Sequence, residues 1–112
     1  MKDPRVYLED ILESIEKIED YTKGMDFPTF FKQSKTQDSV VRRLEIIGEA
    51  TKRISQKIKN EHAHVPWKQI AGMRDVLIHE YAGVVLQRVW NVVVKEIPKI
   101  KKDIKKIIAK LQ

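Results

Sequence analysis

The stretch that decides the fold is VVRRLEIIGEATKRI, residues 40–54. Apolar side chains recur in it every three or four positions, which is the spacing of one face of an α-helix rather than the alternation of a strand. A helix beginning at Thr36 or Asp38 places one stripe on a single side: Val40, Leu44, Ile47, Thr51, Ile54 and Ile58. Gly48 lies beside the stripe, where a missing side chain permits close approach of another helix. We therefore expect a long amphipathic helix that packs against neighbours.

The residues before this stretch predict a second long helix. Asp3 is placed as an N-cap and Pro4 as the first helical residue. The apolar face of this helix consists of Leu8, Ile11, Ile15 and Ile18, and the helix runs to about Tyr21. Gly24 ends it, and residues 26–31 read as a short helical turn whose aromatic side chains enter the core.

The second half of the chain continues in helical spacing. Pro66 begins a helix with Trp67 and Ile70 facing inward. Residues 84–97 are ambiguous, because Val92, Val93 and Val94 favour a strand, whereas Leu86, Trp90, Val93 and Ile97 keep the helical period. No second strand exists to pair with them, so we expect a helix. Pro98 then starts the last helix, whose apolar stripe comprises Ile100, Ile104, Ile107, Ile108 and Leu111. The prediction is an all-α, up-and-down bundle of four to five helices forming one domain over residues 1–112.

Composition narrows the class of protein. The chain has 112 residues, of which 42% are apolar and 34% charged, which fits a globular domain rather than a disordered chain. Cysteine is absent from the sequence, so disulfides and thiolate metal sites are excluded. No apolar run approaches a membrane span, and the acidic N-terminus lacks the layout of a signal peptide. We expect a cytoplasmic protein without a membrane partner.

Charge is distributed unevenly along the chain, whose net charge is +6. Residues 1–20 hold seven acids against three bases, and residues 95–112 hold seven lysines against Glu96 and Asp103. One interpretation pairs these two segments as antiparallel neighbours in the bundle. The other makes the basic segment a surface that faces RNA, with Lys102 and Lys106, together with Arg42, as candidate phosphate contacts.

The sequence Arg74-Asp75-Val76-Leu77-Ile78-His79-Glu80-Tyr81 carries the candidate chemistry. If a helix runs from Trp67 through Tyr81, uninterrupted at Gly72, Arg74 falls in the middle of its apolar face. A buried guanidinium needs a partner, an edge or an interface. Asp75 and His79 are four positions apart, so the carboxylate can orient the imidazole. Arginine provides a permanent charge for phosphate, and histidine exchanges protons near neutral pH.

Structural explanations remain open for the same residues. Arg74 could extend its guanidinium to solvent, and His79 could be a cation at the C-terminal end of a helix. His62 and His64, with Glu61 beside them, form a second histidine pair. Because no further ligand lies nearby in sequence, ordinary surface polarity explains that pair better than a metal site. We expect no metal and no cofactor.

Residues 72–81 resemble the Arg-x4-His-x-Tyr signature of HEPN-domain toxins, the HepT-like ribonucleases. Three further segments are similar to that family in the same order along the chain: residues 7–11, 41–50 and 65–70. The resemblance therefore spans nearly the whole sequence. One departure is Asp75, where the wider HEPN pattern usually has an asparagine.

The resemblance implies a homodimeric, metal-independent endoribonuclease that acts as the toxin of a toxin–antitoxin pair. Arg74 would clamp the scissile phosphate, His79 would act as general base or acid, and Asp75 would support them. A minimal nucleotidyltransferase antitoxin would transfer AMP to Tyr81 and so block the site. The alternative is a non-catalytic helical partner subunit of that nucleotidyltransferase, which the acid at Asp75 favours. A basic DNA-binding protein ranks last, because the sequence has no convincing helix-turn-helix.

Overall fold

All regular secondary structure in the described part of the chain is helical. The computed structural model describes residues 3–80 and 86–111, except for the side chains of residues 74–80. The elements are α1 (Pro4–Thr22), α2 (Phe27–Phe31), α3 (Ser34–Arg53), α4 (Gln56–Glu61), α5 (Trp67–Glu80), α6 (Leu86–Asn91), the π-helical turn η2 (Val92–Glu96) and α7 (Ile97–Leu111). These described residues contain no strand, so the all-α prediction is confirmed, including for the three consecutive valines.

The two N-terminal helices begin where their capping residues predict. The Asp3 carboxylate accepts a hydrogen bond of 2.9 Å from the backbone N–H of Arg5, with Pro4 as the first helical residue. Asp26 caps α2 in the same way, accepting from the backbone N–H of Thr29 at 2.9 Å. Between them the chain turns at Gly24, whose φ of 74° lies in the left-handed region that favours glycine.

Helix α3 differs from its prediction at both ends. It begins at Ser34, ahead of Thr36 and Asp38, after an N-cap at Gln33 that makes no side-chain capping bond. It ends at Arg53, because Ile54 is extended and the Ser55 hydroxyl caps α4 by accepting from the backbone N–H of Ile58 at 3.3 Å. The expected single stripe is therefore divided between two helices. Both of its last members, Ile54 and Ile58, nevertheless remain buried in the core.

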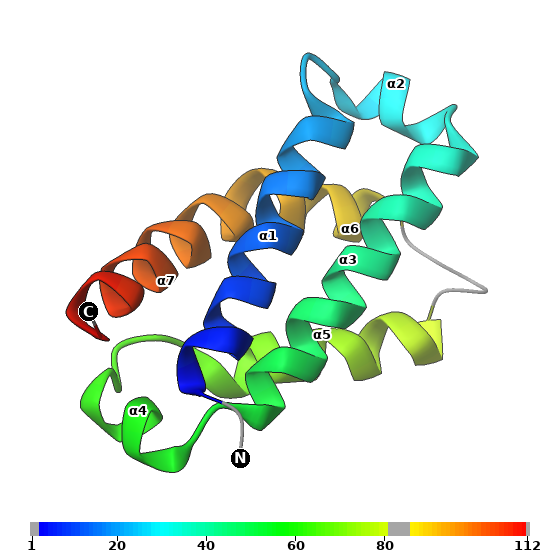
Figure 1. Ribbon diagram of the computed structural model, residues 1–112. Helices are drawn as coiled ribbons and strands as arrows, with labels where there is room; N and C mark the ends of the chain where they lie inside the picture. The colour runs from blue at the N-terminus through cyan, green and yellow to red at the C-terminus, as the bar shows by residue number, and fades with distance from the viewer. Residues whose placement is uncertain (1–2, 81–85, 112) are drawn as a thin grey trace.

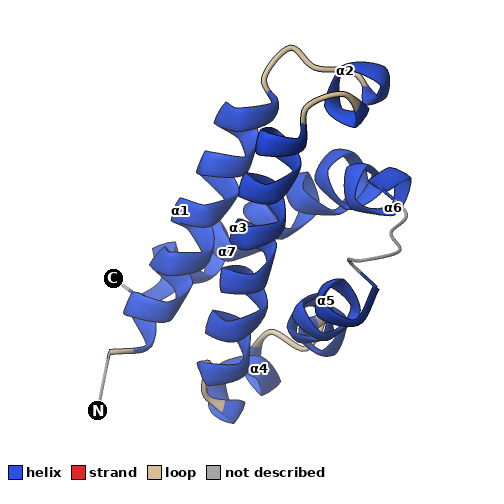
Figure 2. Cartoon of the chain, turned by 90° about the vertical axis from the view of Figure 1, so that its right-hand side faces the viewer, coloured by secondary structure: helices blue, strands red, loops and turns tan. Residues whose placement is uncertain are grey.

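The long helices are arranged around α1. It packs against α3 on one side and α7 on the other, while α5 packs on α3 and crosses behind it (Figure 1). Figure 2 shows the short helix α2 at one end of the bundle, close to α6, and α4 at the other end. The core contains Leu8, Ile11, Ile15, Ile18, Phe30, Val40, Leu44, Ile47, Ile70, Ile97, Ile104 and Ile107. Among the described residues no helix is both long and apolar enough to cross a bilayer.

Residues 86–111 form one continuous helical rod with a π-helical turn inside it. Helix α6, η2 and α7 follow each other without a break, so Pro98 does not restart the chain as predicted but lies within the first turn of α7. Pro98 has no N–H to donate to the hydrogen-bond ladder of this continuous helix, and it directly follows the π-helical turn, where the N–H of Ile97 already reaches back five residues to the carbonyl of Val92. The π-turn coincides with three buried side chains at steps of four residues, Val89, Val93 and Ile97. A straight α-helix would carry them about 40° further round at each step, whereas a looser turn keeps them on one face.

Candidate functional site

Residues 74–80, which are the motif apart from Tyr81, form the C-terminal half of helix α5. The helical backbone is continuous from Trp67 to Glu80 and is not broken at Gly72, as the helical projection required. Arg74, Asp75 and His79 therefore belong to this helix, with Asp75 and His79 one turn apart along the backbone. Their side chains lie outside the described part of the structure, and Tyr81 lies outside the described residues.

The N-terminal half of α5 anchors the motif to the core. Ile70 is 2% exposed and Trp67 is 8% exposed, so both face inward as predicted. The indole N–H of Trp67 also donates to the backbone carbonyl of His62 at 3.0 Å, which fixes the loop that precedes the helix. Burial of two such side chains contributes several kcal/mol, about 1.5–3 for each apolar side chain. The motif thus follows a rigid first turn rather than a loose loop.

A hollow of about 550 Å³ lies between α1 and α3. Its lining comprises Tyr7, Asp10, Arg42, Glu45, Ile46, Glu49, Ala50 and Arg53. Its charged α3 members, Arg42, Glu45, Glu49 and Arg53, recur at helical spacing along the polar side of the helix, whose other side packs in the core. Arg42 and Glu45 form an ion pair at 3.6 Å. With two guanidinium groups and three carboxylates, the hollow presents both signs of charge rather than a purely cationic surface.

The three candidate RNA contacts do not share one surface. Arg42 lines the hollow between α1 and α3, and its side chain is 69% exposed. Lys102 and Lys106 are exposed on α7, which contacts α1 on the side away from α3. Helix α1 lies between α3, the helix of Arg42, and α7, the helix of the two lysines (Figure 1).

Sequence reasoning singled out Arg42 but not the hollow around it. Arg53 was predictable, because it continues the spacing of Arg42, Glu45 and Glu49 along the polar side of α3. Tyr7 and Asp10 carried no such signal, since only the packing of α1 on α3 brings them there.

The histidine pair ahead of α5 forms a surface contact with α7. The rings of His62 and His64 have centroids 6.2 Å apart, and His64 Nε2 lies 3.7 Å from Asp103 Oδ1. Over the described residues, no group of three histidine, aspartate or glutamate side chains gathers closely enough to hold a metal ion. Of the pair, His64 brings the loop before α5 next to Asp103 of the C-terminal helix.

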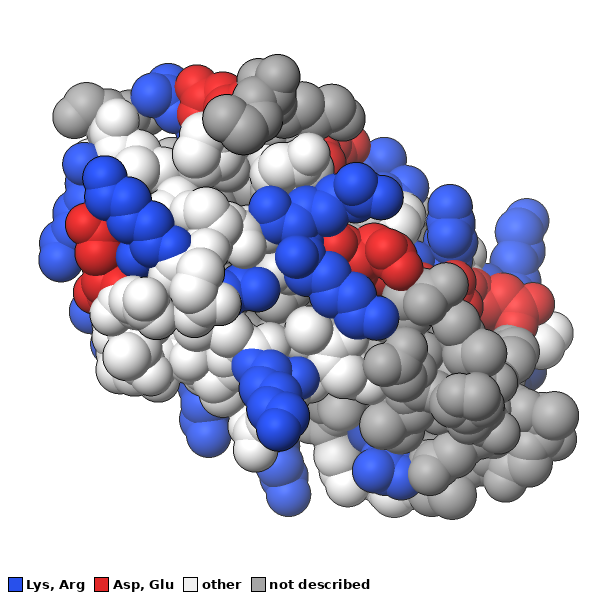
Figure 3. Space-filling model, turned by 90° about the horizontal axis from the view of Figure 1, so that it is seen from below, with Lys and Arg blue, Asp and Glu red and all other residues white. Residues whose placement is uncertain are grey.

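Basic side chains are widely scattered over part of the surface. Figure 3, which views the molecule from below, shows lysines and arginines interleaved with acidic and uncharged residues on that face. No continuous basic field covers the described part of it. The net charge of +6 therefore does not by itself locate an RNA-binding surface.

Comparison with known proteins places the chain in a family. The family model described as "Ribonuclease HepT-like" matches residues 11–107. A protein of Caldanaerobacter subterraneus subsp. tengcongensis, named "Putative RNase", is 47% identical over 110 residues, covering 98% of both chains. A Thermococcus cleftensis protein named "Probable ribonuclease HepT" is 46% identical over 101 residues, which is 90% of this chain and 92% of the relative.

A longer relative shares the same region. The Methanocaldococcus jannaschii protein named "Gamma-glutamylcyclotransferase and putative RNase" is 50% identical over 110 residues. The match covers 98% of this chain but only 50% of that relative, so the chain spans about half of its length. No solved structure matches the chain significantly. With a family model that covers most of its length and near-full-length relatives close to half identical, the chain belongs to the HepT-like ribonuclease family.

Proposed function

We propose that this protein is the toxin of a toxin–antitoxin pair, a metal-independent endoribonuclease that cleaves RNA between two copies of the chain. The observation that carries the proposal is the Arg74-x4-His79-x-Tyr81 spacing at the end of a helix anchored in the core. Membership of the HepT-like ribonuclease family supports it, as do the relatives' names.

The proposed reaction uses the 2′-hydroxyl of RNA as nucleophile. A general base removes the proton of the 2′-hydroxyl, whose oxygen attacks the adjacent phosphorus while the bond from phosphorus to the 5′-oxygen breaks. A general acid then protonates the leaving 5′-oxygen. The products are a 2′,3′-cyclic phosphate and a free 5′-hydroxyl. Arg74 stabilises the charge that develops on the phosphoryl oxygens, and Asp75 orients His79 from one helical turn away.

The reaction needs both an acid and a base, and each chain has one motif histidine. A homodimer with two-fold symmetry supplies His79 twice at one interface. It also gives Arg74 a site at the edge of the interface, where a charged side chain meets substrate. For these reasons we place the catalytic cleft between two copies.

Tyr81 is the proposed point of regulation. A nucleotidyltransferase antitoxin would transfer AMP from a nucleoside triphosphate to the tyrosine hydroxyl, releasing pyrophosphate. The added phosphate, two residues from His79, would repel the RNA backbone and fill the cleft. Mass spectrometry after co-expression with a neighbouring nucleotidyltransferase tests this step. A Tyr81 that stays unmodified, while the partner is active on a control substrate, argues against this route.

The decisive experiment is RNA cleavage in excess EDTA. We expect the wild-type protein to cut RNA, and Arg74→Ala and His79→Ala each to lower the rate by about 10²–10⁴-fold. A single 2′-deoxynucleotide at the cut site should abolish cleavage there.

Two matched controls lie outside the motif. Lys68→Ala removes an exposed lysine from the same helix, and His64→Ala removes an exposed histidine. Both variants should cleave RNA at the wild-type rate. Equal cleavage by all variants would rule out the mechanism. If the folded wild-type protein cuts no RNA with or without added metal, the non-catalytic partner subunit of the nucleotidyltransferase becomes the better description.

A further inference from the structure

Helix α7 carries a row of lysines along its outer side. Ile97, Ile100, Ile104 and Ile107 bury the inner side. On the opposite side Lys99, Lys102, Lys106 and Lys110 are exposed, and at about 100° per residue they fall within an arc of about 80°. The row is about 16 Å long. We name these four lysines the basic ridge.

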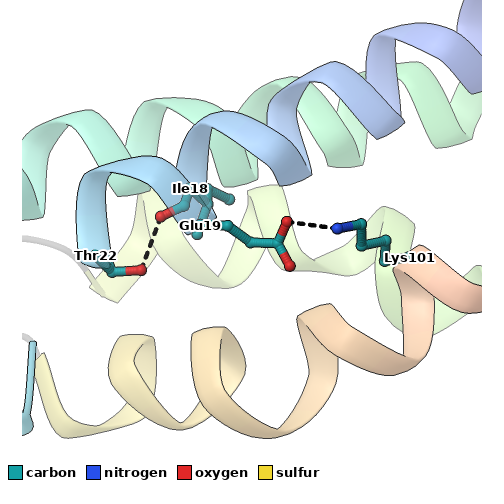
Figure 4. A network of polar contacts seen from close by, with 4 residues as sticks. All are labelled: Ile18, Glu19, Thr22 and Lys101. Atoms are coloured by element: carbon teal, nitrogen blue, oxygen red, sulfur yellow. Dashed lines mark hydrogen bonds and ion pairs between the residues drawn. The ribbon is translucent and has the colours of Figure 1, made fainter. Parts of the chain in front are cut away.

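The basic ridge is free of ion pairs with any residue that the structure describes. Of the other charged residues of α7, Lys105 is exposed beside the ridge, and Lys101 and Asp103 contact neighbouring elements. Lys101 is half-buried and bonded to Glu19 of α1 at 2.8 Å (Figure 4), and that hydrogen bond raises the pKa of Lys101 above its usual value. Asp103 lies 3.7 Å from His64. The four ridge ammonium groups are left to solvent.

Helix α1, the neighbour of α7, carries the opposite pattern. Glu9, Glu13, Glu16 and Asp20 are exposed along its outer side, within an arc of about 60°. We name them the acidic ridge; of its members, Glu13 pairs with Lys17 of the same helix at 3.6 Å. The two helices run antiparallel, since Arg5 contacts the backbone of Leu111 and Glu19 contacts Lys101. A positive row and a negative row therefore lie on adjacent helices. The two helices are joined by the Glu19–Lys101 ion pair, whose members belong to neither ridge.

We propose that the basic ridge of α7 is the track for the RNA backbone outside the catalytic motif, and that the acidic ridge of α1 is its border. Successive ridge lysines are spaced by three or four residues, about 4.5–6 Å along the helix, which lets each reach a different phosphate of one strand. Phosphate contacts release counterions from the strand. The neighbouring carboxylates repel the same backbone, so the strand is held on one side of α1.

A membrane surface fits the basic ridge less well. Helices that lie on a bilayer insert their apolar face between the lipids, and the apolar face of α7 is occupied by the core. This inference rests on the proposed ribonuclease function only for the identity of the ligand, because binding does not need the catalytic step.

The test measures binding without cleavage. The probe is a fluorescent single-stranded 2′-O-methyl RNA, which lacks the nucleophile and cannot be cut through its 2′-oxygen. The four ridge lysines are changed together to glutamine, which keeps helix propensity. The matched control changes Lys23, Lys32, Lys35 and Lys57 to glutamine, four exposed lysines elsewhere on the chain. Both variants are first shown to melt like wild type.

We expect the ridge variant to lose affinity on the order of tenfold or more at low salt. Its slope of log affinity against log salt should become shallower by roughly 0.7 for each lysine that contacts a phosphate. The control variant should lose much less. Changing Glu9, Glu16 and Asp20 to their amides should strengthen binding, because the border is removed.

Three results would overturn the proposal. Equal losses in the ridge and control variants would mean that net charge alone attracts RNA. Unchanged RNA binding, with loss of binding to vesicles containing phosphatidylserine, would make the ridge a lipid contact. Unchanged RNA binding, with loss of binding to an acidic peptide, would make it a protein contact. Cleavage in EDTA is measured separately, so RNA binding by a protein that does not cut would contradict the proposed function and leave the track in place.

Discussion

At the scale of single residues, Gln37 has a structural role that its sequence context does not reveal. Its side chain is 8% exposed, and Nε2 donates to the backbone carbonyls of Phe30 and Phe31, both at 2.9 Å. These carbonyls lie at the end of α2, where a helix leaves acceptors without partners. The Gln37 amide thus connects α2 to α3 by two hydrogen bonds. The pattern of apolar residues had indicated only that a helix begins near this polar residue.

Removing that amide should loosen the tie. Gln37→Leu keeps the volume but withdraws the donor, and we expect it to lower the free energy of unfolding by roughly 1–2 kcal/mol. Phe30 keeps a second donor in the backbone N–H of Gln33, which limits the loss. Urea denaturation measures the effect. Gln56→Leu, at an exposed amide of α4, is the control and should change stability by less than about 0.5 kcal/mol. Identical midpoints for all three proteins would contradict this role.

The motif residues show where sequence reasoning was strong and where it stopped. Their spacing was read directly from the sequence, and the helical projection assumed continuity through Gly72, which the structure confirms. The partners of Arg74 were not predictable, because they depend on which helices meet around it. Asp10 and Tyr7 in the hollow illustrate the same limit, since tertiary packing alone places them beside Arg42.

At the scale of elements, α2 depends on a charged cap. Hydrogen bonds from Thr29 hold the pKa of Asp26 below its ordinary value of 3.8. A carboxylate whose folded-state pKa is depressed stabilises the fold above its ordinary pKa, and that contribution is lost as the pH falls through the folded value. The cap should therefore act fully at neutral pH and disappear in acid.

Asp26→Ala tests the cap through its pH dependence. We expect a lower melting temperature than wild type at pH 7, and a difference that shrinks as the pH falls below about 3.8. Asp20→Ala, at an exposed carboxylate outside any cap, should show no such convergence. A difference for Asp26→Ala that stays constant from neutral to acidic pH would show that the carboxylate charge does not support the helix.

Element boundaries were predicted unevenly, and for local physical reasons. Asp3, Pro4 and Gly24 marked α1 correctly because capping and backbone freedom are properties of single residues. The sequence analysis missed the end of α3 at Ile54, because the spacing of apolar residues continues across it. A new helix, α4, begins there with Ser55 as its N-cap. Pro98 was misread as a break because the sequence does not reveal the π-turn before it. That turn already alters the hydrogen-bond pattern of the helix, so the helix continues through the proline.

At the scale of the whole molecule, the all-α fold class followed from the pattern of apolar residues. The number of copies in the assembled protein did not follow from that pattern. Every long helix has an apolar stripe, and stripes of that width require a helical bundle. The pairing of the acidic and basic segments was also foreseen in part. The two ends are antiparallel neighbours, yet they meet through Glu19 and Lys101 while their outer ridges remain in solvent.

A mixed dimer tests whether two copies share one catalytic cleft. When one subunit carries His79→Ala and the other is wild type, a shared acid and base predict a loss close to that of the doubly substituted dimer. Two independent sites predict half of the wild-type rate instead. Subunits with different tags, co-expressed and purified through both tags, provide the sample for cleavage assays in EDTA. A half-active mixed dimer would place a complete site in each chain.

The π-turn at Val92–Glu96 gives the C-terminal rod a place that can absorb a change in chain length. Removing one residue there should restore an ordinary α-helix and leave the faces of α7 almost unchanged, because a π-helical turn holds one residue more than an α-helical turn. Removing one residue within α7 itself would instead rotate every residue after it by about 100°. The first deletion should leave the melting temperature close to that of wild type, whereas the second would exchange surface for core along the rest of α7.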